Sequence, residues 1–197
     1  MKKIILASNS PRRKEILEKG KIDFQIKTAE CTEFYSAHFD EEIIKQNSKN
    51  KASAAALKEG NEEVLIVAAD TMVILDSVCL VKPRNNFEAL FMLKKLSNKT
   101  HMVVTSHTVM NSKTKFEITK TSKSYVTFKK LNLFEIIKYI LIKKPLDKAG
   151  SYGIQDFLTP ETVSNPPASS FISKLEGSYY NVMGLDLDLI LNMLKNF

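Results

Sequence analysis

Four polar residues with the means to bind an anion follow the first apolar run of the sequence. Ser8, Ser10, Arg12 and Arg13 lie in the stretch S-N-S-P-R-R. Ser10 followed by Pro11 is a typical helix start, which places both arginines in the first turn. Cations are unfavourable there because free N–H groups and the helix dipole already present positive charge. A bound phosphate would compensate. Two exposed arginines, tolerated at about 0.3 to 1 kcal/mol, are the alternative.

A carboxylate follows a buried run. Asp70 ends the apolar stretch V-L-I-V-A-A-D and is followed by Thr71. In α/β sheets, ligands gather at the carboxyl ends of strands, where a carboxylate could hold Mg²⁺ or accept a proton from an attacking water. The alternative is that Asp70 is an ordinary turn residue.

Two lysines are further candidates. Lys51 shares a helical face with Ile44 and Ala55, so it points toward the apolar side of its helix and would need an anionic partner if buried. Lys82 directly precedes Pro83 on a short connection. Either side chain could instead be solvated, since long lysines often reach water from an apolar surface.

A glycine-containing cluster, D-K-A-G-S-Y-G-I-Q, spans residues 147–155. Its two glycines would let the backbone approach a ligand closely, and the amide of Gln155 could read the edge of a base. The sequence contains neither G-x-G-x-x-G nor G-x-x-x-x-G-K-[ST]. Dinucleotide-dependent oxidoreductases and P-loop NTPases are therefore disfavoured.

Soft-metal and dithiol chemistry is also disfavoured. Cys31 and Cys79 form no C-x-x-C pair, and the three histidines lack H-E-x-x-H spacing. We therefore expect any metal to be a hard cation bound by oxygen.

The elements that must position these residues follow from the apolar pattern of the 197-residue chain. Strands are predicted at residues 2–7, 22–28, 64–70, 71–75, 78–81, 101–110 and 115–129, with a hairpin turn at Asp76-Ser77. Helices are predicted from Pro11 to a stop at Gly20, from the cap Asp40 to Gly60, over 87–97 with Asn86 as cap, over 133–144 before Pro145, and over 187–197. Residues 156–170 are expected to form an irregular surface excursion. This alternation indicates an α/β fold, and without repeats or a linker we expect a single domain over residues 1–197.

The composition limits the partners. A net charge of +7 raises the question of an acidic partner, but it comes from lysines scattered along the chain. Without aromatic residues interleaved among them, we expect no nucleic-acid binding. No apolar run is long enough for a membrane span, and the apolar N-terminal run is too short for a signal peptide. We therefore expect no membrane association and a cytoplasmic protein.

The motifs together resemble a known family, the Maf nucleoside triphosphate pyrophosphatases. They occur in family order and cover nearly the whole chain. The matching stretches are L-A-S-N-S-P-R-R-K-E-I-L (6–17), A-A-D-T-M-V-I-L (68–75), K-P-R (82–84), M-L-K-K-L-S (92–97), T-H-M-V-V-T (100–105), D-K-A-G-S-Y-G-I-Q (147–155) and G-S-Y-Y-N-V-M-G-L (177–185).

The resemblance implies an elongated, bent mixed sheet with flanking helices and a cleft between two lobes, similar to inosine triphosphate pyrophosphatases. It implies hydrolysis of a nucleoside triphosphate to the monophosphate and pyrophosphate with a divalent cation, Mg²⁺ or Mn²⁺. Asp70 would be the proton acceptor and would share the metal with Glu33. The residues implied to hold the phosphates are Ser8, Arg12, Arg13, Lys51 and Lys82.

The resemblance also implies a base preference. Arg12, Thr71 and Gln155 match the subgroup that acts on dTTP and UTP, and modified pyrimidine nucleotides would be further substrates. The chain departs from the family pattern at Asn98, Asp156 and Asp186. A homodimer is expected by family analogy. The alternative function is a nucleotide-binding regulator of septum formation and cell division, which the family has been linked to.

Overall fold

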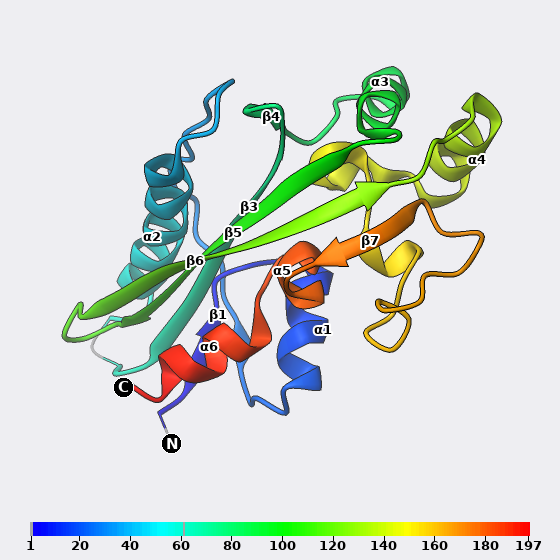
Figure 1. The fold of residues 1–197 in the computed structure, drawn as a ribbon. Coiled ribbons are helices and arrows are strands. Elements are labelled where there is room, and N and C mark those ends of the chain that lie inside the picture. Colours follow the sequence, from blue (N-terminus) through cyan, green and yellow to red (C-terminus); the bar gives the residue numbers. More distant parts are fainter. Residues whose placement is uncertain (1, 61) are drawn as a thin grey trace.

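A single mixed sheet organises the part of the chain that the computed structural model describes, residues 2–60 and 62–197 (Figure 1). Its order is β2-β1-β3-β5-β6-β7, and β4 also pairs with β3. β1 is parallel to β2 and β3, and the other pairs are antiparallel. The strands are β1 (Ile4–Leu6), β2 (Gln25–Ile26), β3 (Leu65–Leu75), β4 (Val78–Leu80), β5 (Thr100–Asn111), β6 (Glu117–Phe128) and β7 (Ile172–Glu176). The predicted α/β class is confirmed.

Helices flank this sheet. They are α1 (Pro11–Lys19), α2 (Glu41–Leu57), α3 (Asn86–Leu96), α4 (Leu133–Lys143), α5 (Tyr179–Met183) and α6 (Leu187–Leu194), with 3₁₀ turns η1 (Pro145–Asp147), η2 (Ala149–Ser151) and η3 (Ile154–Asp156). In Figure 1, α2 lies on one side of the long strands, and α1, α5 and α6 lie on the other. No described helix is both long and apolar enough to cross a membrane.

Alternation along β3 assigns its side chains to the two faces. Ile66 and Ala68 pack with alanines of α2, whereas Val67 and Ala69 belong to the core cluster on the opposite face. By the same alternation, Asp70 faces α2 and its neighbour faces α1. One short segment of β3 therefore supplies polar groups to both faces of the sheet.

The position predicted for Asp70 at a strand end is wrong. The predicted strands 64–70 and 71–75 form one eleven-residue strand, in which Asp70 pairs with Ser106 of β5. On the other edge of β3, however, β1 ends opposite Val67, and β4 begins to pair only at Val73. Residues 68–72 therefore face a gap between β1 and β4. Asp70 lies at the centre of this gap, just past the carboxyl end of the parallel pairing.

Several other helix and strand boundaries differ from the predicted ones. The cap of α3 is Asn85, whose Oδ1 accepts from the N–H of Glu88 at 3.0 Å, so the prediction of Asn86 is wrong. α2 ends at Leu57 rather than Gly60, and the strand predicted over 22–28 covers only Gln25–Ile26. The irregular stretch predicted over 156–170 begins one residue later, because Asp156 still belongs to the 3₁₀ turn η3, and residues 157–170 contain no strand or helix. β7 and α5 were not predicted because both are short.

The three departures from the family pattern have local roles. Asn98 adopts a positive φ of 58°, which asparagine tolerates better than most residues. Asp156 accepts from the hydroxyl of Tyr139 at 2.8 Å. Asp186 caps α6 and accepts from Ser122 at 2.7 Å.

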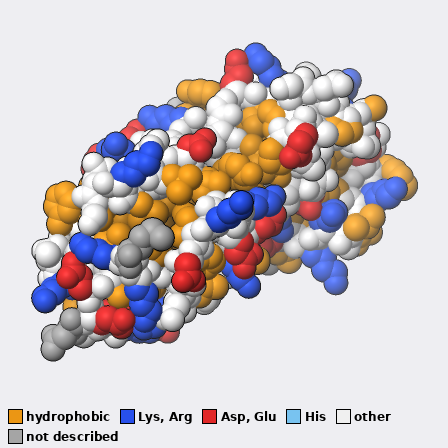
Figure 2. All heavy atoms as spheres, turned by 90° about the horizontal axis from the view of Figure 1, so that it is seen from below, with side chains coloured by type: hydrophobic (Ala, Val, Ile, Leu, Met, Phe, Trp, Pro, Cys, Tyr) orange, Lys and Arg blue, Asp and Glu red, His pale blue; other side chains and the backbone are white. Residues whose placement is uncertain are grey.

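Acidic and basic side chains are mixed on the molecular surface seen in Figure 2. The net charge of +7 is therefore not gathered into one basic field on that face.

Candidate functional site

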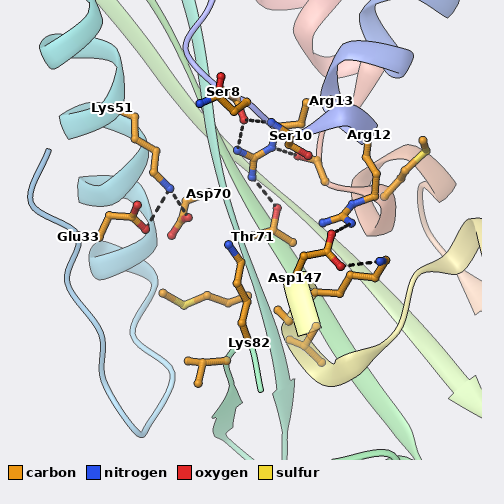
Figure 3. A pocket seen from close by; sticks show the side chains of 18 of the residues that line it. Ser8, Ser10, Arg12, Arg13, Glu33, Lys51, Asp70, Thr71, Lys82 and Asp147 are labelled. Atoms are coloured by element: carbon orange, nitrogen blue, oxygen red, sulfur yellow. Dashed lines mark hydrogen bonds and ion pairs between the residues drawn. The ribbon is translucent and has the colours of Figure 1, made fainter. Parts of the chain in front are cut away.

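A cavity of about 1100 Å³ lies at the gap in the sheet (Figure 3). Its lining contains all nine residues predicted for the site, from six parts of the chain. They are Ser8, Arg12 and Arg13 from the β1–α1 junction, Glu33 from the loop before α2, Lys51 from α2, Asp70 and Thr71 from β3, Lys82 after β4, and Gln155 from η3.

Arg13 is held by three neutral acceptors among the described residues. Its Nε donates to the carbonyl of Gly184 at 2.9 Å, Nη1 to Ser8 Oγ at 3.2 Å, and Nη2 to Thr71 Oγ1 at 3.3 Å. Burial lowers the pKa of Arg13, and the charge of Asp70 opposes this shift. Since a guanidinium has five N–H groups, one on each Nη is left for a ligand. The group is thus a positioned cation, and no carboxylate of residues 2–60 or 62–197 contacts it.

Arg12 is paired differently. Its Nη1 donates to Asp147 Oδ2 at 2.8 Å, and Lys148 Nζ donates to Asp147 Oδ1 at 2.6 Å. Asp147 and Lys148 both line the cavity, and neither was predicted as a site residue. Their signal in the sequence was the glycine-containing cluster that they begin. The carboxylate of Asp147 thus binds the guanidinium of Arg12, which was predicted to bind a phosphate.

The start of α1 is open to a ligand. Ser10 is at the predicted N-cap position, but its hydroxyl makes no capping bond within the described residues, and Pro11 opens the helix. The first turn contains no acidic residue. Its N–H groups and dipole therefore add to the positive potential of the two arginines.

Two carboxylates converge on one ammonium. Lys51 Nζ lies 2.7 Å from Asp70 Oδ1 and 3.2 Å from Glu33 Oε2. The anionic partner predicted for Lys51 is therefore present, and the face of α2 that carries it is the one packed on β3. Each of the two carboxylates is brought into reach of the same cation, although Glu33 and Asp70 come from different segments.

These two carboxylates fit a hard divalent cation. Carboxylate oxygens are the ligands that Mg²⁺ prefers, and such an ion is usually held by one or two of them together with substrate phosphates and water. Among the described residues, no group of three or more His, Cys, Asp and Glu side chains is arranged to hold a metal. Glu33 and Asp70 therefore match a site that a nucleotide would complete.

Gln155 carries an unused acceptor. Its Oε1 is buried and has no hydrogen-bond partner among the described residues. The amide lies across Gly153, where an added Cβ would come within 2.8 Å of Nε2. A buried acceptor without a partner costs about 1–3 kcal/mol, which a ligand N–H would offset.

Lys82 reaches the cavity from the end of β4. Its side chain is exposed, whereas the following Pro83 is buried and holds the connection in place. Figure 3 shows Lys82 and Lys51 approaching the cavity from different elements. Both ammonium groups can therefore meet one anionic ligand from different sides.

Comparison with known proteins gives a consistent result. The family model described as Maf-like protein matches residues 3–197. Proteins named dTTP/UTP pyrophosphatase from Bacillus cereus (strain G9842) and Bacillus cytotoxicus are each 42% identical over 198 residues, covering 100% of this chain and 96% of theirs. The structure of the Staphylococcus aureus Ham1 protein is similar in fold, with a TM-score of 0.50, 15% identity and 99% of both chains covered. The chain described here belongs to the Maf-like protein family.

Proposed function

We propose that this protein hydrolyses nucleoside triphosphates, with dTTP and UTP as preferred substrates, to the monophosphate and pyrophosphate. One observation carries the proposal: the guanidinium of Arg13, held by three neutral acceptors, lines the same cavity as two carboxylates that share one ammonium. The first group suits a polyphosphate, and the second suits a metal and an attacking water. The names of the Bacillus relatives support the choice of substrates.

The phosphates would be held by the basic groups. Arg13 offers its two remaining N–H groups as a fork, while Lys51 and Lys82 act as point charges. Ser8 contributes its hydroxyl beside the open start of α1. For Arg12 to join them, a phosphate must replace or share its contact with Asp147.

Asp70 would accept the proton of the attacking water. The water oxygen forms a bond to the α-phosphorus, the bond to the bridging oxygen breaks, and pyrophosphate leaves with that electron pair. Lys51 Nζ contacts Oδ1 of this carboxylate at 2.7 Å and so holds it in place. A divalent cation, Mg²⁺ or Mn²⁺, held by Glu33 and Asp70 would neutralise charge on the triphosphate and the leaving group.

The base would be read at Gln155. Its free Oε1 suits the N3–H donor that thymine and uracil share and that cytosine lacks. Thr71 and Arg12 would complete the pyrimidine preference. The hydroxyl of Thr71 lies 3.3 Å from Arg13 Nη2 and 3.1 Å from Thr105 Oγ1. We further propose that residues 1–197 act as one domain on the cytoplasmic nucleotide pool.

The test is pyrophosphate release from dTTP, UTP, CTP, GTP, ATP and 7-methyl-GTP with Mg²⁺ or Mn²⁺. We expect release from dTTP and UTP, and a decrease in kcat of about 10²- to 10⁴-fold in Asp70→Asn with nucleotide binding retained. Asp76→Asn is the matched control, because Asp76 is an exposed carboxylate in the turn after β3.

Each other outcome has a defined meaning. Unchanged kcat in Asp70→Asn would remove Asp70 from the mechanism. Release from 7-methyl-GTP alone would contradict the base preference. Binding without release from any nucleotide would favour the alternative, a nucleotide-binding regulator that uses the same cavity.

A further inference from the structure

Asn47 is a wholly buried amide behind the cavity wall. It lies on α2 four residues before Lys51, so both side chains occupy the helix face that packs on β3. A buried amide is unfavourable unless its polar atoms are paired. No role for Asn47 follows from its sequence context, which makes its contacts informative.

Both polar atoms of the amide are paired, and both of its N–H donors are used. Its Oδ1 accepts from the N–H of Phe34 at 2.7 Å, and Nδ2 donates to the carbonyl of Phe34 at 2.9 Å and to Asp70 Oδ2 at 3.0 Å. The backbone of Phe34 decides the orientation of the amide, because the N–H must meet Oδ1. Nδ2 is therefore directed at the carboxylate of Asp70.

Asp70 is consequently held at both oxygens. Lys51 contacts Oδ1 and Asn47 contacts Oδ2, so the two donors define the plane of the carboxylate. With one donor alone, the group could rotate about its Cβ–Cγ bond, a broad torsion. The remaining lone pairs are thereby kept in one direction.

The same amide fixes the segment that carries Glu33. Residues 27–36 form no helix or strand, so tertiary contacts must position them. Asn47 pairs with both polar backbone groups of Phe34, which directly follows Glu33 in the chain. One side chain thus links the two carboxylate-bearing segments of the site.

We propose that Asn47 is a positioning residue that sets the orientation of Asp70 and the location of Glu33 relative to it. The inference rests on the proposed function, since it assigns Asn47 a part in that reaction. Asn47 does not contact the cavity, so its effect passes through the two carboxylates. Removing it should slow the chemical step while leaving nucleotide binding by the basic groups nearly unchanged.

The chain offers a matched control. Asn50 Nδ2 donates to the carbonyl of Thr32 at 2.9 Å, which anchors the same segment on the other side of Glu33. No contact joins Asn50 to Asp70 among the described residues. Asn50→Ala therefore loosens the segment without releasing the carboxylate.

The experiment compares Asn47→Leu, Asn47→Ser and Asn50→Ala with the wild-type protein. Thermal unfolding identifies folded variants, and Asn47→Ser removes the amide without adding apolar bulk should the leucine not be accommodated. The readouts are kcat for dTTP and the Kd of an α,β-methylene analogue of dTTP. We expect kcat to fall about 10- to 100-fold in the Asn47 variants, with Kd changed by less than about threefold and Asn50→Ala close to wild type.

Two outcomes would overturn this inference without affecting the proposed function. One is a kcat within about threefold of wild type in the folded Asn47 variants. The other is an equal loss of kcat and of affinity that Asn50→Ala reproduces. The second would mean that Asn47 only anchors the segment. A wild-type protein that releases no pyrophosphate would overturn the proposed function itself, and the inference with it.

Discussion

Replacing Arg13 with glutamine should separate activity from stability. The guanidinium lies in the cavity with three neutral acceptors, Gly184 O, Ser8 Oγ and Thr71 Oγ1. Among the residues that the structure describes, no carboxylate contacts this charge. If its purpose is to meet a polyphosphate, the loss should appear in kcat/KM much more than in the melting temperature.

The size of the effect follows from the donors that remain. Two N–H groups of Arg13 are free for a ligand, and a charge-assisted hydrogen bond contributes about 1.5–3 kcal/mol. Losing both costs about 3–6 kcal/mol, or about 10²- to 10⁴-fold in kcat/KM at 1.4 kcal/mol per tenfold. Arg13→Lys keeps the charge but not the fork, so we expect about 10- to 100-fold.

Stability should change little. The amide of the introduced glutamine is neutral, so folding no longer requires the desolvation of an ion. This gain offsets the free energy lost with the hydrogen bonds to the three neutral acceptors. Arg84→Gln is the matched control, because Arg84 is exposed and pairs with Glu88 outside the cavity.

The assay is steady-state pyrophosphate release from dTTP beside thermal unfolding. A loss in kcat/KM of less than tenfold, or one no larger than in Arg84→Gln, would refute the role of Arg13 as a phosphate ligand. A large drop in melting temperature that accompanies the lost activity would show instead that Arg13 maintains the fold.

Three further predictions test other parts of the structure. The backbone of Gly153 can accept alanine, but the added Cβ would lie 2.8 Å from Gln155 Nε2 and displace the amide. The ratio of kcat/KM for dTTP to that for GTP should therefore fall about tenfold in Gly153→Ala. An unchanged ratio would exclude Gln155 from base recognition. Chelation of divalent ions should abolish pyrophosphate release, Mg²⁺ or Mn²⁺ should restore it, and circular dichroism should stay unchanged because Lys51 already pairs with both carboxylates. Hydrogen bonds from Lys123 and Thr121 lower the pKa of Glu41 from 4.5 to about 2. Above pH 4.5, the ionised carboxylate of Glu41 therefore stabilises the folded protein. Glu41→Gln should therefore melt below wild type at pH 7, and the difference should disappear as the pH falls from 4.5 to 2; a constant difference would contradict this linkage.

Local signals in the sequence predict most of the framework. Asp40 caps α2 by accepting from the N–H of Glu42 at 2.9 Å, and Pro145 follows the end of α4 as expected. Such signals act over a few residues, so each can be interpreted without the rest of the chain. Short elements lack them: β7 has five residues at the sheet edge, and its burial does not alternate regularly.

The partners of the site residues could not be predicted in this way. Arg12 and Asp147 are separated by 135 residues, and their contact depends on how η1 returns to the start of α1. Asn47 gave no signal because an asparagine on a helix is usually solvated, and only the approach of Phe34 and Asp70 gives its amide a use. The sequence shows which charged residues the chain contains. Which of them pair across the cavity depends on the tertiary structure.

The gap in the sheet explains why these groups converge. A strand paired on both edges would present Asp70 and Thr71 to opposite faces, with the sheet separating them. Because β1 ends opposite Val67 and β4 begins to pair at Val73, one edge of β3 is uncovered where these two side chains lie. A ligand at that edge can reach both faces at once, meeting the carboxylate beside α2 and the hydroxyl that supports Arg13 beside α1. The short β1 and the late start of β4 are therefore as necessary to the site as its charged residues, and extending either strand across residues 68–72 would close it.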